Sequence, residues 1–180
     1  MKKLVKLIGL IALITAAGFT MIACPSGGGS SDGSGYVPSG GSNYGNFTLR
    51  GKTYTFGQEG EIQDYGSEFS LCLFTEQTED LYIIIEFDLY GPENSDVLVA
   101  GTYNMSETNK PFTFDFGCVD MNTKDDSNYY YVSGGTVKVT VSGKGENATY
   151  TITIDCTLED DDEKPAGTVK GTYKGPITYI

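Results

Sequence analysis

Between residues 46 and 180 the chain alternates apolar and polar residues with a period of two, in short runs rich in Val, Ile, Thr, Tyr and Phe. Successive side chains of a strand point to opposite faces, so this period indicates half-buried β-strands. Glycine-rich turns such as Ser133–Gly135 separate the runs at spacings typical of antiparallel sandwiches and barrels. We therefore expect one all-β, antiparallel domain over 46–180, with barrel and sandwich both open. The runs are Thr53–Phe56, Phe69–Phe74, Leu81–Leu89, Phe112–Cys118, Thr136–Val141 and Thr149–Leu158.

Two of these runs predict which side chains form the core. In Leu81–Leu89 the odd-numbered residues are apolar, and Glu86 and Asp88 are expected to point outward. In Thr149–Leu158 the even-numbered residues form the apolar set. An acidic loop and a Gly-Thr-Tyr sequence follow each run, at 101–103 and at 171–173. This weak repeat predicts two long hairpins in one sheet system, although β-rich sequences also resemble one another by chance.

The first 23 residues have the pattern of a secretory signal peptide. Lys2, Lys3 and Lys6 precede an apolar run, and no acidic residue occurs before Asp32. The apolar run 7–23 is shorter than the roughly 20 residues that cross a bilayer comfortably, which favours a cleaved signal over an uncleaved anchor helix. We expect residues 1–23 to be removed.

The four residues Met21–Cys24 resemble the lipobox of bacterial lipoproteins, in which the cysteine is lipidated and becomes the first residue. The resemblance implies a lipid on Cys24 and a membrane partner reached through that anchor. Because Pro25 rather than Asp follows the cysteine, it also implies the outer membrane, with periplasmic face and cell surface both open. Residues 24–45 then form a Gly/Ser-rich tether of flexible composition.

The segments 133–141, 150–154 and 169–179 together resemble the C-terminal part of small all-β lipoproteins of Gram-negative anaerobes. The resemblance implies an antiparallel barrel or sandwich, sometimes compared to lipocalins, with no assigned activity. The similar positions are turn and strand residues, so no functional residue is transferred to this chain.

The composition excludes several classes of function. The chain contains no His, which removes Ser-His-Asp and Cys-His catalysis and His-ligated zinc. Its 24 acidic residues against 12 Lys and Arg give a net charge of −12, which argues against nucleic acid as a partner. No nucleophile or cofactor motif is present, so we expect no cofactor and place an enzyme last among the functions.

Three cysteines remain in the β domain once Cys24 is assigned to lipid. Strict alternation places Cys118 on a face with Phe114 and Phe116, Cys156 on the apolar face of its run, and Cys72 opposite the apolar residues of its own run. We expect a Cys118–Cys156 disulfide, with three free thiols as an equal alternative.

Two acidic groups offer the oxygen ligands that Ca²⁺ prefers: the run Glu159–Glu163 and the looser set of Asp120, Asp125 and Asp126. Neither has the alternating acidic residues and glycine of a calcium loop. We interpret both as solvated hairpin ends and expect no metal site.

Tyr129, Tyr130 and Tyr131 are consecutive on an expected strand, so at least one ring lies on the opposite face from the others. An outward ring could stack on a ligand, while packing at the edge of the core is the alternative. We therefore expect a non-enzymatic envelope protein of unassigned activity that binds a small ligand or a glycan. The alternative is a structural or protein-interaction lipoprotein.

Overall fold

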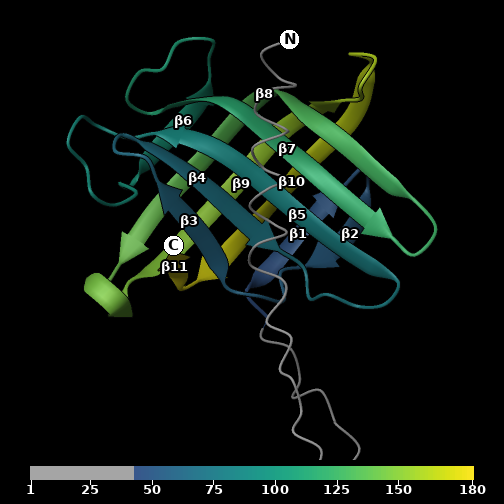
Figure 1. Ribbon diagram of the computed structural model, residues 1–180, viewed down its shortest axis with the longest axis horizontal. Helices are drawn as coiled ribbons and strands as arrows, with labels where there is room; N and C mark the ends of the chain where they lie inside the picture. Colours follow the sequence, from purple (N-terminus) through teal and green to yellow (C-terminus); the bar gives the residue numbers. More distant parts are fainter. Residues whose placement is uncertain (1–42) are drawn as a thin grey trace, which may run out of the picture. The chain divides into compact units, whose positions relative to one another are not determined.

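The computed structural model describes residues 43–180, which form an all-β unit (Figure 1). The all-β prediction is confirmed: this part contains eleven strands, one 3-10 turn (η1, Gly145–Asn147) and no α-helix. No helix within it is long and apolar enough to cross a membrane. The strands are β1 (Gly45–Leu49), β2 (Lys52–Thr55), β3 (Gly60–Asp64), β4 (Glu68–Phe74), β5 (Leu81–Tyr90), β6 (Gly101–Met105), β7 (Thr113–Thr123), β8 (Ser127–Ser142), β9 (Thr149–Glu159), β10 (Pro165–Gly175) and β11 (Ile177–Tyr179).

The expected signal peptide (1–23), the lipidation site Cys24 and most of the expected tether (24–45) lie outside the described residues. These three predictions therefore stay predictions. The first strand, β1, begins at Gly45, one residue before the start expected for the β domain.

All strands belong to one sheet, in the order β11-β3-β4-β5-β7-β6-β8-β9-β10-β1-β2. Neighbours are antiparallel except for β6–β7 and β11–β3. The sheet curls strongly into a half-barrel, as Figure 1 shows. Only Pro176 separates β10 from β11, so the chain passes from its pairing with β9 directly to a pairing with β3. This connection links two regions far apart in the sheet order.

The core lies on the concave side of the sheet and follows the predicted alternation. In β9 every expected inward residue, from Tyr150 to Leu158, belongs to the buried core. In β5 four of the five expected residues are buried there, and Leu81 packs partly against them. Glu86 and Asp88 point to the other side, as expected, because they alternate with these core residues. Large side chains fill the interior, among them Phe47, Phe56, Phe69, Phe87, Phe114, Tyr103 and Tyr173.

One of the two predicted hairpins is wrong. Strands β9 and β10 pair along their length, as the repeat predicted. Strand β5, however, pairs with β4 and β7, whereas β6 pairs with β8 and touches the start of β7. Strands β7 and β8 pair only near their connecting turn, and β6 runs between them where they separate. The shared Gly-Thr-Tyr sequence is therefore a local likeness rather than a likeness of pairing.

Candidate functional site

The three consecutive tyrosines lie on two faces of β8. Tyr130 is directed toward the core and is 5% exposed. Tyr129 and Tyr131 lie on the convex side, where their rings meet edge to face with centroids 4.9 Å apart. Of the expected ligand-facing aromatics, two therefore lie together outside the core, and the third is separated from them by the thickness of the sheet.

Tyr129 and Tyr131 continue a patch of aromatic and acidic side chains on the convex side of β4, β5 and β7. Cross-strand pairs place these residues side by side: Phe74 opposite Ile84, Asp88 opposite Phe116, and Cys118 opposite both Glu86 and Tyr131. We call this patch the aromatic face. It consists of Phe74, Tyr82, Ile84, Glu86, Asp88, Phe116, Cys118, Tyr129 and Tyr131.

The side chains of the aromatic face are buried or half-buried, although they point away from the core. Ile84 is 5% and Phe116 7% exposed, and Glu86 and Asp88 are also buried. Phe74 and Tyr82 stack with ring centroids 6.2 Å apart. Because every strand in residues 43–180 belongs to one sheet, no second sheet of the described part covers this face. Apolar and aromatic side chains on the face opposite the core distinguish this part of the sheet.

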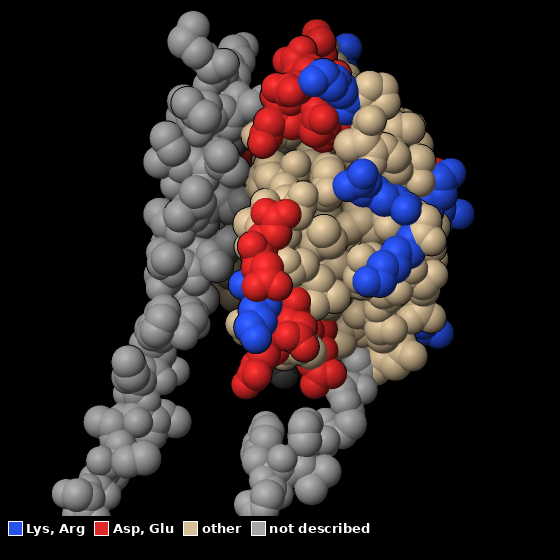
Figure 2. Space-filling model, turned by 90° about the vertical axis from the view of Figure 1, so that its right-hand side faces the viewer, with Lys and Arg blue, Asp and Glu red and all other residues tan. Residues whose placement is uncertain are grey.

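The rest of the convex side has a different chemistry. The outward residues of β8, β9 and β10 are mostly threonines and lysines, which we call the Thr/Lys face: Thr136, Lys138, Thr151, Thr153, Asp155, Lys170 and Thr172. Lys170 and Asp155 form an ion pair at 2.8 Å on it. By contrast, β3, β4, β5 and β7 contain acidic residues and no Lys or Arg. In the view of Figure 2, acidic side chains gather along one margin of the molecule and most basic ones lie away from them.

Glu86 lies at the centre of the aromatic face, between thiols on both neighbouring strands. Cys72 is its cross-strand partner on β4 and Cys118 on β7. Its carboxylate accepts a hydrogen bond from the Ser70 hydroxyl at 2.9 Å and a longer one from the Cys118 Sγ at 3.7 Å. Burial raises the pKa of the Cys72 and Cys118 thiols well above their usual value, and the charge of Glu86 adds to this. Both thiols are therefore protonated at neutral pH and are poor nucleophiles.

The Tyr129 hydroxyl lies next to the Cys118 thiol. Burial raises the pKa of Tyr129, and Cys118 and Glu86 raise it further. Its oxygen is shielded from solvent and makes no well-aligned hydrogen bond within residues 43–180. A buried hydroxyl whose hydrogen-bonding neighbour is a thiol, a weak acceptor, retains hydrogen-bonding capacity for a bound group.

The structure does not bring together the two cysteines of the expected disulfide. All three described cysteines are free thiols. Cys156 lies in the core and its Sγ donates to the Thr136 carbonyl at 3.6 Å, whereas Cys118 lies on the convex side. The reason is a bulge at Asp115, since Asp88 pairs with Phe116 but Leu89 pairs with Phe114. The extra residue reverses the faces, so Cys118 shares no face with Phe114.

The acidic run Glu159–Glu163 forms the end of the β9–β10 hairpin. Asp160 Oδ1 accepts hydrogen bonds from the backbone N–H groups of Asp162 and Lys164, each at 3.0 Å. Lys164 also forms an exposed ion pair with Asp162 at 2.8 Å. Asp160 thus holds the turn together. The other acidic group also contains turn residues: Asp126 accepts from the Ser127 N–H at the β7–β8 turn. No group of three metal-binding side chains occurs among residues 43–180.

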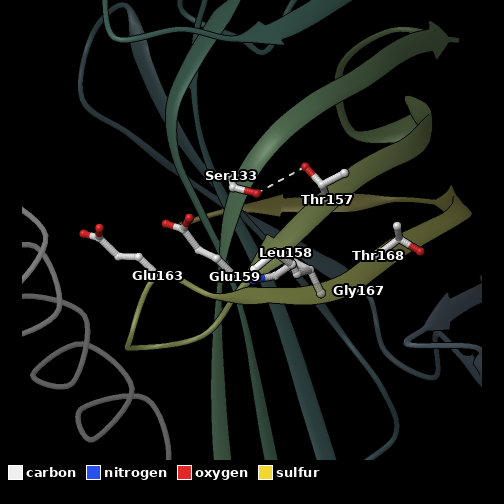
Figure 3. A pocket seen from close by; sticks show the side chains of 8 residues that line it. Ser133, Thr157, Leu158, Glu159, Glu163, Gly167 and Thr168 are labelled. Atoms are coloured by element: carbon white, nitrogen blue, oxygen red, sulfur yellow. Dashed lines mark hydrogen bonds between the residues drawn. The ribbon is translucent and has the colours of Figure 1, made fainter.

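Two of the shallow depressions on the surface of the described part bear on the site. The larger, of about 360 Å³, lies at the bulge of β8 and the end of the β9–β10 hairpin (Figure 3). There the Ser133 hydroxyl is hydrogen-bonded to the Thr157 hydroxyl at 3.2 Å, and not to a side chain that could act as a general base. The smaller, of about 220 Å³, lies at the β1–β2 turn and is lined by Leu49, Arg50, Lys52, Tyr54 and Met121. None of the residues that line this second depression was predicted from the sequence as a site residue.

No known protein-family model matches the chain, and no curated protein or solved structure shows detectable similarity to it.

Proposed function

We propose that the chain is a non-enzymatic binding module of the cell envelope that holds a small ligand or a glycan on its aromatic face. The observation that carries this proposal is the gathering of Phe74, Tyr82, Tyr129 and Tyr131 outside the core. Aromatic rings stack on apolar faces of ligands, and neighbouring carboxylates and hydroxyls bind polar groups.

The filled interior favours a surface site over an internal one. Phe87 and Phe114 meet edge to face at 5.5 Å in the core, and Tyr103 and Tyr173 are fully buried. A lipocalin-like protein that stored its ligand inside would need this space to be empty. The raised pKa of the Cys72 and Cys118 thiols speaks against a cysteine nucleophile, and the chain has no His to activate one.

A protein partner is the second candidate. Strands β3, β4, β5 and β7 contain several acidic residues and no Lys or Arg. The Lys and Arg residues of the described part lie on other elements. Such a face complements a partner that presents Lys or Arg beside apolar side chains.

The test compares the double variant Tyr129→Ala/Tyr131→Ala with the matched variant Thr151→Ala/Thr153→Ala on the Thr/Lys face. Glycans, small apolar molecules and basic peptides are screened by thermal shift and titration calorimetry. We expect the tyrosine variant to weaken binding by about tenfold or more, because two stacking rings are lost. The threonine variant should bind as the natural chain does. Equal affinities of the natural chain and both double variants would show that the aromatic face is not the site. Turnover of any substrate would overturn the non-enzymatic assignment.

We further propose that lipid on Cys24 anchors the protein in the outer membrane. The support is the Met21–Cys24 sequence and the Gly/Ser-rich tether that follows it. A Cys24→Ala variant should remain as an unprocessed precursor, and its mature form should be missing from the outer-membrane fraction. A correctly sized, membrane-bound variant would contradict the anchor.

A further inference from the structure

The β1–β2 turn contains an arginine where such turns favour a different residue. Leu49 pairs with Lys52, which leaves Arg50 and Gly51 as a two-residue loop. Their φ angles of 51° and 83° are both positive, as in a type I′ turn. This turn prefers Asn followed by Gly, because a bulky side chain at positive φ is strained. Arg50 is therefore a poor choice for the turn itself, and strained residues of this kind often have a functional role.

Contacts fix the Arg50 side chain over the end of the core. Its guanidinium lies 5.1 Å from the centroid of the Tyr130 ring, and one N–H donates to the Tyr130 hydroxyl at 2.5 Å. Tyr130 is almost fully buried, so the ring is a rigid support. A guanidinium has five N–H donors in a planar fork, and within residues 43–180 that of Arg50 uses one of them, on the Tyr130 hydroxyl.

A second cation lies beside the first, across the same turn. The Lys52 ammonium is 5.2 Å from the centroid of the Tyr54 ring. No carboxylate among residues 43–180 forms an ion pair with Arg50 or Lys52, even though acidic residues outnumber basic ones by two to one in the chain. Both cations line the 220 Å³ depression, together with Leu49, Tyr54 and Met121.

We propose that this depression is a second binding site, separate from the aromatic face, that takes a small carboxylic acid with an apolar group. The Arg50 fork binds the carboxylate through paired hydrogen bonds, and Lys52 adds charge. The apolar group packs against Met121 and the Tyr54 ring. The size of the depression limits the ligand to a small molecule.

The test uses the purified full chain with phenylacetate as the probe, neutral phenylacetamide as its isostere and inorganic phosphate as a simple anion. Binding is measured by NMR titration and thermal stability by circular dichroism. We expect phenylacetate to bind and phenylacetamide and phosphate not to bind. Arg50→Asn should weaken phenylacetate binding by roughly 10- to 100-fold, the loss expected for hydrogen bonds to a charged group.

The Arg50→Asn variant separates binding from stability, because Asn suits the first position of a type I′ turn. Its melting temperature should be unchanged or higher while binding is weakened. Lys52→Gln should weaken binding less, and Lys138→Gln on the Thr/Lys face should leave it unchanged. The Tyr129→Ala/Tyr131→Ala variant should still bind phenylacetate, so this inference and the proposed function fail independently.

Three results would overturn the proposal. A lowered melting temperature of Arg50→Asn with unaltered phenylacetate binding would show that Arg50 only covers Tyr130. Equal binding of phenylacetamide would show that the carboxylate is not recognised, and equal binding of phosphate would show nonspecific anion attraction.

Discussion

The buried thiols and phenols are the residues most sensitive to alkaline pH. Burial raises the pKa of the Cys156 thiol from its usual 9.0 to about 12, and the pKa values of Tyr103 and Tyr173 from 10.0 to about 12. In the unfolded chain each group releases its proton at the lower pH. The folded state thus holds more protons in this range, and the free energy of unfolding falls as pH rises from about 9 to 12.

We predict that urea denaturation will give a free energy of unfolding about 1–2 kcal/mol lower at pH 10.5 than at pH 8 from Cys156 alone. The variant Cys156→Ala should show a smaller difference between these two pH values. An identical pH dependence would mean that Cys156 ionises equally in both states.

Free thiols at Cys118 and Cys156 give a second prediction at this scale. Denatured, unreduced protein should react with an alkylating reagent at Cys72, Cys118 and Cys156, because the last two sulfurs lie on opposite faces of the sheet. Mass spectrometry of peptides counts the labels. A mass for the 118–156 pair that is lower by two hydrogens, with neither sulfur labelled, would restore the disulfide expected from the sequence.

At the scale of single strands, a bulge decides how β8 is built. Val132 pairs with Leu158 but Gly134 with Thr157, so Ser133 is the extra residue. Gly135 follows with a φ of 118°, and a Cβ there would lie 2.2 Å from the Asp155 carbonyl oxygen. Only glycine meets both demands.

We predict that Gly135→Ala lowers the free energy of unfolding by about 2–4 kcal/mol, since it combines backbone strain with a clash against backbone atoms. Gly66→Ala is the matched control: its φ of 94° is also strained, but a Cβ there meets nothing within 4 Å. We expect it to cost about 1–2 kcal/mol. Equal losses in thermal or urea unfolding would show that the clash at Gly135 is relieved by movement of β9.

The same bulges explain which strands could be predicted from the sequence. The uninterrupted strand β9 follows period two from end to end, and all its core residues were predicted correctly. In β7 a single extra residue at Asp115 moved Phe116 and Cys118 to the convex side, which no alternation pattern reports. The parallel pairing of β11 with β3 and the insertion of β6 between β7 and β8 depend on distant contacts, so local periodicity does not contain them. At the smaller depression, the one available signal was Arg before Gly51 in a two-residue turn.

At the scale of the whole molecule, Tyr173 joins the end of β10 to β3. Its hydroxyl accepts a hydrogen bond from the Gly60 N–H at 2.9 Å and donates to the Pro176 carbonyl. We predict that Tyr173→Phe lowers the free energy of unfolding by about 1–3 kcal/mol, because both backbone groups lose a buried partner.

Thermal unfolding followed by circular dichroism measures this effect. The control is Tyr44→Phe, since that hydroxyl makes no hydrogen bond within residues 43–180, although its ring lies 5.7 Å from that of Tyr173. Equal stability of the two variants would show that the ring of Tyr173, and not its hydroxyl, holds the two strands.

The pairing of β1 with β10 also constrains the order in which the sheet can form. Strand β1 pairs locally with β2, but Gly45 lies opposite Tyr173 and Leu49 opposite Val169, so its second neighbour is present only when almost the last strand has been made. Contacts this distant in sequence make folding slow, because a long loop must close before they form. A growing chain therefore cannot complete this part of the sheet until its final residues are available.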